Sequence, residues 1–306
     1  MKKSEIRKDY LLDRYVIIAP KRSKRPEQIK EASVVISTNS PFTPANLKKD
    51  KRVILDSIGR GLEQIVVIPN IFPAVTMKNL KARGVQEVII DTPDPSARLS
   101  DLSVNHIALL LTMYGRRVKA IMKLKRIQYI LCLKNEGAAA GASIQHEHSQ
   151  IFATEMLPPS IKLEIEQIAE YDKKHGTDFY SDLIKREMKS QRRVYEDKYV
   201  VAFTPYASRA QYEVWIFTKR QAANISKLTK KEIVSTAKVL KMILEKIKKL
   251  GLAYNYICRQ TVSDKHQHFC IKIEPRGSTW AGVELDAGLI INSVPPEEAA
   301  RYYRKK

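Results

Sequence analysis

The sequence repeats itself, and this internal repeat restricts the fold more than any other feature. When Cys132 is placed on Cys258, the same offset places residues 87–90 on residues 213–216. Apolar positions of two predicted helices also match: Ile107, Met113, Val118 and Ile121 fall on Ile233, Val239, Leu244 and Ile247. Each half then closes on a His-x-His strand. An internal duplication explains these matches better than chance does.

Each half predicts the same order of elements, namely strand, strand, helix, strand, strand. We therefore expect an α+β fold, a tandem duplication of a unit in which an antiparallel sheet packs against helices. The first half covers residues 1–178 and the second half covers residues 190–306. Residues 176–194 are expected to link them through a short helix. The two sheets are expected to pack together or to merge.

Two helices carry recognisable end signals. Ser160 is expected to be the N-cap of a helix that runs to about Lys174, with Gly176 just beyond its end. In the second half, Thr229 and Glu232 have the spacing of a capping box, which predicts a helix from this point to Gly251.

Composition indicates a globular protein of the cytoplasm. The chain has 306 residues, of which 44% are hydrophobic, and no run approaches the ~20 apolar residues that a membrane helix needs. The first ten residues, MKKSEIRKDY, lack the apolar core of a signal peptide. Three cysteines without close spacing do not form a disulfide framework. We therefore expect no membrane partner.

The formal net charge of +21 points to a partner that carries phosphate. That partner is either a nucleic acid or an anionic small molecule. The basic residues are spread along the chain and do not alternate with aromatic residues, as they do in proteins that bind single strands. We therefore do not expect nucleic acid to be the partner, although much of this charge is also compatible with a plain lysine-rich surface.

The candidate chemistry lies in residues 134–151, KNEGAAAGASIQHEHSQI. A run rich in glycine and alanine leads into His146, His148 and Gln150, which stand two residues apart. In an extended strand, side chains at this spacing leave from one face. The chain has only six histidines, and four of them occur in two His-x-His pairs. This pattern suits chemistry better than it suits packing.

Three kinds of chemistry fit this stretch. A metal site is the first, but zinc needs about four ligands. General acid–base hydrolysis is the second. The third is nucleophilic catalysis at phosphorus, in which a neutral imidazole attacks and becomes a phospho- or nucleotidyl-histidine. The third needs small residues and backbone N–H groups around the phosphate oxygens, and Gly137, Gly141 and Ser143 provide them directly upstream.

The motif formed by Asn135-x-Gly137, Gly141-x-Ser143 and His146-x-His148-x-Gln150 resembles the active-site signature of galactose-1-phosphate uridylyltransferases, in the histidine-triad superfamily. The resemblance extends over most of the chain. VIIAPKRSKRP is similar to the N-terminal motif of that family, and PNIFPA to its uridine-side loop. The segments EPRGSTWAGVELDAG and NSVPPEEAA are similar to its C-terminal segments.

The resemblance implies a double-displacement reaction of galactose metabolism. His148 would attack the α-phosphorus of UDP-glucose, glucose 1-phosphate would leave, and galactose 1-phosphate would then take the uridylyl group. Gln150 would hydrogen-bond a phosphoryl oxygen. It stands where histidine-triad hydrolases have a third histidine, and it favours transfer to an acceptor over release to water. The residues expected to bind substrate are Arg22, Arg25, Asn70, Asn135, Gly137, Gly141 and Ser143.

The chain departs from the family where the family binds metals. Ser40 and Thr43 stand in place of zinc thiolates, and Pro95 stands in place of a histidine ligand, so that only His146 is left of the first site. We expect no zinc there, because one imidazole does not hold zinc. At the second family site the four positions are occupied by Glu164, His268, Arg259 and Cys270, and a metal is doubtful because arginine cannot ligate one. We expect no cofactor.

Alternatives remain open at this point. The same nucleophile serves phosphorylases that transfer an adenylyl group and act on ADP-sugars or dinucleoside polyphosphates. The chain could also be an inactive protein that binds nucleotides or nucleic acid. In many relatives a proline stands where this chain has Glu147. The pair of His266 and His268 is interpreted as a remnant of the duplication, and we expect a homodimer that binds a nucleotide sugar and a hexose 1-phosphate.

Overall fold

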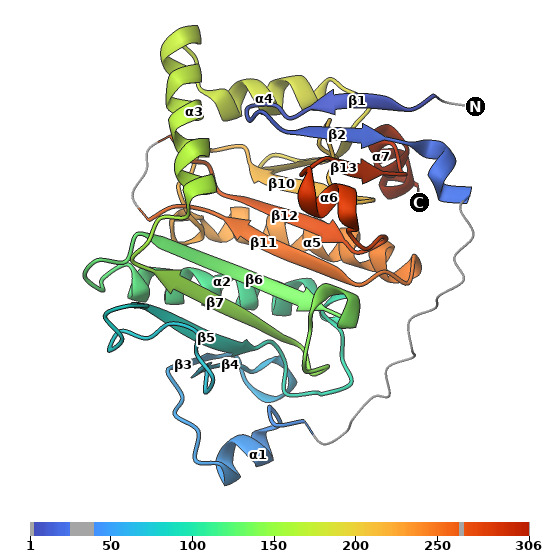
Figure 1. Cartoon of the computed structure of the whole chain (residues 1–306). Coiled ribbons are helices and arrows are strands. Elements are labelled where there is room, and N and C mark those ends of the chain that lie inside the picture. The colour runs from blue at the N-terminus through green and yellow to red at the C-terminus, as the bar shows by residue number, and fades with distance from the viewer. Residues whose placement is uncertain (1–2, 25–39, 263–265, 306) are drawn as a thin grey trace.

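The computed structural model describes residues 3–24, 40–262 and 266–305. Its centre is one ten-stranded antiparallel sheet (Figure 1). The strands follow one another across the sheet in the order β3 (Asp56–Ile58), β4 (Ile65–Pro69), β5 (Gly84–Ile90), β7 (His148–Thr154), β6 (Tyr129–Glu136), β11 (Tyr254–Arg259), β12 (Cys270–Pro275), β10 (Val214–Thr218), β9 (Val200–Phe203) and β8 (Arg193–Glu196). The predicted α+β fold is confirmed, and the two sheets merge.

The two halves meet where β6 pairs with β11. In this pairing Cys132 lies directly opposite Cys258, the residue that matches it in the sequence repeat. An antiparallel pair that joins two equivalent residues relates the halves by a local two-fold rotation. The division at residues 178 and 190 stays a prediction, because the halves share a continuous sheet.

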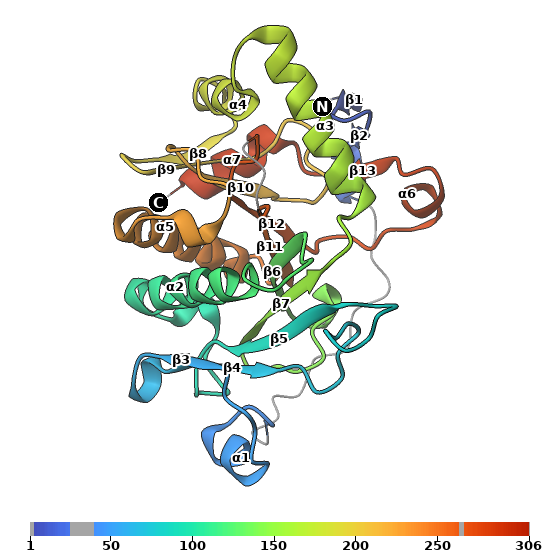
Figure 2. The ribbon, with the colours of Figure 1, turned by 90° about the vertical axis from the view of Figure 1, so that its left-hand side faces the viewer.

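One face of the sheet is covered by two helices, α2 (Val104–Ile121) and α5 (Lys230–Lys249), which lie side by side (Figure 2). Equivalent residues cap them: Ser103 accepts a hydrogen bond from a backbone N–H of α2, and Thr229 does so for α5. The capping box of Thr229 and Glu232 is confirmed. Both helices bury their apolar faces in the main core, with Leu111 and Leu240 fully buried.

The register of the repeat differs from the sequence match in one strand pair. Ile151 on β7 and Ile271 on β12 are equivalent, because they pair with Cys132 and Cys258. Glu87 pairs with Ile151, whereas Ile216 pairs with Ile271. The structural partner of Glu87 is therefore Ile216, three residues beyond Glu213, on which the constant offset placed it. The loop between this strand and the following 3-10 helix is correspondingly shorter in the second half.

The other face of the sheet is covered in its second half by α3 (Pro159–His175) and α4 (Phe179–Met188). The helix expected in the link is α4. The predicted N-cap of α3 is wrong: Pro158 occupies that position, and Ser160 lies within the first turn. Gly176 ends α3 with a φ of +68°, as the sequence indicated.

A second, three-stranded sheet joins the ends of the chain. It contains β1 (Glu5–Lys8), β2 (Tyr15–Ile18) and β13 (Ile290–Asn292). The remaining helices are α1 (Pro44–Lys49), α6 (Gly282–Asp286), α7 (Pro296–Arg304), and the 3-10 turns η1 (Pro20–Lys24), η2 (Gly61–Glu63), η3 (Leu99–Asp101), η4 (Ala138–Ala140) and η5 (Ile225–Lys227). In the described part of the chain, no helix is both long and apolar enough to cross a membrane.

Candidate active site

His148 is the first residue of β7, which lies between β5 and β6 near the centre of the sheet. Ile151 and Ala153 on the same strand are buried in the core beneath α2. Because side chains alternate along a strand, His148 and Gln150 project from the opposite face. His146 precedes the strand, and its ring is buried against neighbouring loops. The expectation that three side chains share one strand face therefore holds only for His148 and Gln150.

One backbone hydrogen bond fixes the orientation of the His148 ring. Its Nδ1 lies 2.9 Å from the carbonyl oxygen of His146. A carbonyl oxygen can only accept, so Nδ1 carries the proton and Nε2 keeps its lone pair. Burial and the nearby charge of Lys134 lower the pKa of His148. The ring is therefore neutral at neutral pH, and Nε2 is available as a nucleophile.

A cavity of about 360 Å³ adjoins His148. It is lined by residues 134–138 and 142–148 together with Arg98. Four of the predicted site residues therefore border one cavity, namely His148, Asn135, Gly137 and Ser143. The predicted residues of the glycine loop (residues 137–143) are Gly137, Gly141 and Ser143, and of these only Gly141 does not line the cavity.

The glycine loop contains two residues in backbone conformations that only glycine adopts easily. Gly137 has a φ of +84° and Gly141 a φ of +81°, and η4 lies between them. A Cβ atom at Gly137 would lie 2.8 Å from the Cβ of Ala253, which belongs to the second half. The loop therefore packs tightly against the second half, and its residues 137–139 are exposed. The N–H groups of Ala140, Gly141 and Ala142 donate to carbonyl oxygens within the loop.

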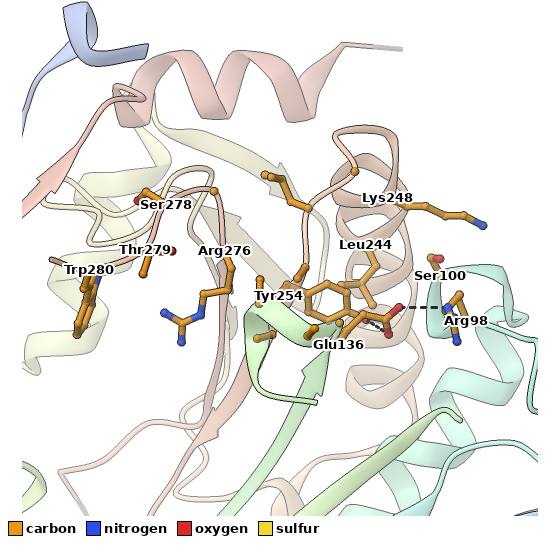
Figure 3. Close-up of a pocket in the computed structure, with 18 residues that line it drawn as sticks. Arg98, Ser100, Glu136, Leu244, Lys248, Tyr254, Arg276, Ser278, Thr279 and Trp280 are labelled. Atoms are coloured by element: carbon orange, nitrogen blue, oxygen red, sulfur yellow. Dashed lines mark hydrogen bonds and ion pairs between the residues drawn. The ribbon is translucent and has the colours of Figure 1, made fainter. Parts of the chain in front are cut away.

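A larger cavity of about 980 Å³ also borders this loop (Figure 3). The two cavities share Arg98 and residues 136–138. Figure 3 shows Glu136 between Arg98 and Tyr254. Its carboxylate forms an ion pair with Nε of Arg98 at 3.6 Å and accepts a hydrogen bond from the hydroxyl of Tyr254 at 3.4 Å. Arg276 also lines this cavity. Two arginines, Arg98 and Arg276, therefore line the cavity that the glycine loop borders.

The side chain of Asn135 is held by the second half. Nδ2 of Asn255 donates to Oδ1 of Asn135 at 2.7 Å, and it also donates to the carbonyl oxygen of Ala140 at 2.8 Å. Arg276 in turn donates to Oδ1 of Asn255. Because Oδ1 of Asn135 accepts, its amide hydrogens are left to donate toward the cavity. The sequence repeat placed Asn255 on Tyr129 and gave no sign of this role.

Gln150 is oriented by a residue that the sequence did not single out. Oε1 of Gln86, on β5, accepts from the backbone N–H of Ala74 at 2.9 Å, which leaves its amide nitrogen 3.5 Å from Oε1 of Gln150. The amide hydrogens of Gln150 are thereby free to donate elsewhere. Asn70 lies next to Gln86 as well, because its backbone N–H donates to the carbonyl oxygen of Gln86 at 3.0 Å.

The two predicted arginines lie elsewhere. Arg22 belongs to η1, which follows β2 in the three-stranded sheet, and it does not line the cavity beside His148. Arg25 lies outside the described residues. The structure therefore brings together one group of predicted residues around the glycine loop and a second group around Gln150, but it does not bring Arg22 to them.

At the first family metal position, hydrogen bonds take the place of ligand bonds. Nδ1 of His146 lies 2.8 Å from Oγ of Ser40, and Nε2 donates to the carbonyl oxygen of Thr92 at 2.7 Å. Both ring nitrogens are thus engaged within the protein. Thr43 caps α1 through a hydrogen bond from Asn46. These residues do not fit a zinc ion.

At the second position an arginine occupies the place of a ligand and forms an ion pair with Glu164. Burial alone would raise the pKa of Glu164, but the charge of Arg259 outweighs it and lowers the pKa. His268 is packed between the rings of Tyr180 and Phe217, and burial lowers its pKa to about 4. Within the described residues, no three His, Cys, Asp or Glu side chains converge where a metal could bind.

The comparisons with known proteins agree with the resemblance seen in the sequence. Residues 70–158 match the family described as galactose-1-phosphate uridyl transferase, N-terminal domain. A galactose-1-phosphate uridylyltransferase of Thermotoga maritima is 27% identical over 98% of both chains. The crystal structure of an ADP-glucose phosphorylase from Arabidopsis thaliana with bound ADP-glucose has a TM-score of 0.87, with 28% identity over 99% of both chains. A solved uridylyltransferase has a TM-score of 0.76, with 27% identity over 98% of this chain and 97% of that chain.

Proposed function

We propose that this chain, an enzyme related to the galactose-1-phosphate uridylyltransferases and to ADP-glucose phosphorylase, transfers a nucleotidyl group through His148. One observation carries the proposal. The Nδ1–H of His148 is held by the carbonyl of His146, so the lone pair of Nε2 remains available beside a cavity bordered by the glycine loop. This combination supports attack on a phosphorus atom better than it supports metal binding or hydrolysis.

In the first step, Nε2 of His148 attacks the α-phosphorus of a nucleotide sugar. The Nε2–P bond forms, the bond from the α-phosphorus to the bridging oxygen breaks, and a hexose 1-phosphate leaves with that electron pair. The phosphorylated imidazole ring becomes positive. Its remaining N–H donates to the carbonyl oxygen of His146, and a charge-assisted hydrogen bond of this kind stabilises the cation.

In the second step, a phosphate oxygen of the acceptor attacks the same phosphorus. The new P–O bond forms, the Nε2–P bond breaks, and His148 returns to its neutral form. The double displacement needs no proton transfer by the enzyme in either step. Gln150 can donate to the phosphoryl oxygens without supplying a proton to the leaving group, which favours transfer over hydrolysis.

The residues around the cavity supply donors for phosphate oxygens. The amide hydrogens of Asn135, the hydroxyl of Ser143 and the backbone N–H groups of Ala138 and Ala139, at the start of η4, can bind the phosphates. These donors are preorganised, because Asn255 fixes Asn135 and the two positive-φ glycines fix the loop. Preorganised donors stabilise the charge that develops on the transferring group without further rearrangement.

Two nucleotide sugars fit this mechanism. Uridylyl transfer from UDP-glucose to galactose 1-phosphate is supported by the family match over residues 70–158. Phosphorolysis of ADP-glucose, in which inorganic phosphate takes the adenylyl group and ADP is formed, is supported by the higher TM-score of 0.87. We take ADP-glucose with phosphate as the first pair to test. The homodimer stays a prediction.

The test is a product assay with both substrate pairs. Purified protein is incubated with ADP-glucose and inorganic phosphate, or with UDP-glucose and galactose 1-phosphate, and the nucleotide products are separated. The proposal expects one pair to be converted by the wild type and by His175→Ala, whose histidine lies exposed at the end of α3. His148→Ala should be inactive. Conversion of either pair by His148→Ala at the wild-type rate would overturn it.

A further inference from the structure

A buried ammonium group lies behind the proposed nucleophile. Lys134, on β6, has only 1% of its surface exposed. Its Nζ donates to Oδ2 of Asp91 at 2.9 Å and forms an ion pair with Glu147. Both carboxylates are buried as well, Asp91 fully and Glu147 to all but 2%. Three ionisable side chains are therefore enclosed together beside the strand that carries His148, and burial raises the pKa of Glu147 well above its ordinary range.

Burial of these side chains is energetically unfavourable, and Lys134 stands at a position of β6 that faces the apolar core. Ile130 and Cys132 occupy the same face of β6 and belong to the main core. Transfer of charged groups from water to such a place is unfavourable unless they pair well. Burial alone would lower the pKa of Lys134, but the carboxylates of Asp91, Glu147 and Glu136 outweigh it and raise the pKa. Lys134 therefore remains a cation inside the protein.

The buried cluster contacts each residue from 147 to 149. Nζ of Lys134 donates to the carbonyl oxygen of His148 at 3.1 Å. On one side, the carbonyl of Glu147 accepts from the backbone N–H of Asp91 at 3.0 Å. On the other side, the hydroxyl of Ser149 donates to Asp91 at 2.8 Å. The backbone that carries the imidazole is thus anchored at the nucleophile and on both sides of it.

We propose that Lys134 is a positioning residue for His148. Its ammonium holds the carbonyl of His148 and the side chains of Asp91 and Glu147. These contacts set the direction in which Nε2 of His148 faces the cavity. The inference rests on the proposed function, in which His148 is the nucleophile. Pairing with Glu147 makes a buried lysine tolerable here. Orientation matters because a displacement of about 1 Å can lower a rate by about 100-fold.

The test separates positioning from folding by means of two variants. Lys134→Met leaves two buried carboxylates without their cation, so it should lower both the Tm and the single-turnover rate of His148 nucleotidylation. Lys134→Met/Glu147→Leu removes the cation together with one carboxylate. This double variant should regain much of the lost Tm, whereas its rate should stay about 100-fold below wild type, with KM for the nucleotide sugar changed by less than about threefold.

The control is Lys219→Met, which removes a half-exposed lysine from its ion pair with Glu196 and should leave the rate unchanged. The inference is overturned if the folded double variant regains the wild-type rate, or if its loss lies in KM alone. If Lys134→Met does not fold, the double variant still decides. Failure of the wild type to form a nucleotidyl-histidine would instead contradict the proposed function, so the two failures are distinguishable.

Discussion

Asn255 donates to Asn135 at 2.7 Å across the junction of the two halves. The same amide donates to the carbonyl of Ala140 in the glycine loop. The second half thus orients a phosphate-binding side chain and part of the phosphate loop of the first half. The duplication therefore provides more than a second core, because the residues that carry the chemistry depend on both copies.

Asn255→Leu should weaken substrate binding. The substitution keeps the size of the side chain but leaves the Ala140 carbonyl and Oδ1 of Asn135 without their donor. A buried polar group left unpaired costs about 1–3 kcal/mol, and about 1.4 kcal/mol corresponds to a tenfold change in binding. We expect KM for the nucleotide sugar to rise about tenfold. Asn105→Leu, at an exposed position of α2, is the control, and equal effects of both variants would contradict the role of Asn255.

Gly137→Ala should disturb the phosphate loop. A φ of +84° is unfavourable for alanine, and the new Cβ would lie 2.8 Å from Ala253. Backbone strain of this kind costs about 1–3 kcal/mol, so the Tm and the rate of product formation should both fall. Gly282→Ala adds a methyl group where nothing lies within 4 Å. The expectation is wrong if the two variants behave alike.

The pH dependence of nucleotidylation should reflect the neutral state of His148. Burial and the charge of Lys134 lower its pKa below the ordinary value of about 6.5. Because the neutral form is the nucleophile, activity is lost only as the pH falls through this lowered pKa. The pH at which the first step reaches half of its maximal rate should therefore lie below 6.5, the ordinary pKa of histidine. A half-maximal rate at or above pH 6.5 would contradict the lowered pKa.

Metal removal should have no effect on the protein. His146 is hydrogen-bonded to Ser40 and Thr92, and Arg259 is paired with Glu164, so neither family position has the ligands that zinc needs. We expect elemental analysis to find substoichiometric zinc, and we expect EDTA to leave the Tm and the activity unchanged. One zinc per chain would contradict this expectation.

The fold could be predicted from the repeat, because apolar periodicity and helix caps are local features of the sequence. The periodic apolar residues of α2 and α5 and the cap at Thr229 are read directly from the sequence. The structural match of Glu87 with Ile216, three residues beyond Glu213, was not predictable. Strand register depends here on the length of a loop, which the apolar pattern does not show. The N-cap of α3 was misplaced because Ser160 is a good cap by type, whereas the chain enters the helix at Pro158.

The site was predictable where one short segment carries it. Residues 134–151 contain both the nucleophile and the phosphate loop, so spacing alone was informative. Residues that act from other strands escaped the prediction: Asn255, Gln86 and Asp91 become neighbours of the site only through strand pairing. Lys134 lies within the segment, but alternation along a strand does not indicate that a lysine is buried.

The central claim is that His148 accepts a nucleotidyl group. The most direct measurement is incubation with ADP-glucose and UDP-glucose labelled with ³²P at the α-position, followed by mapping of the labelled peptide. We predict an acid-labile, base-stable label on the peptide that contains His148, present in His175→Ala and absent from His148→Ala. No label from either nucleotide sugar, or a label that persists in His148→Ala, would contradict the account.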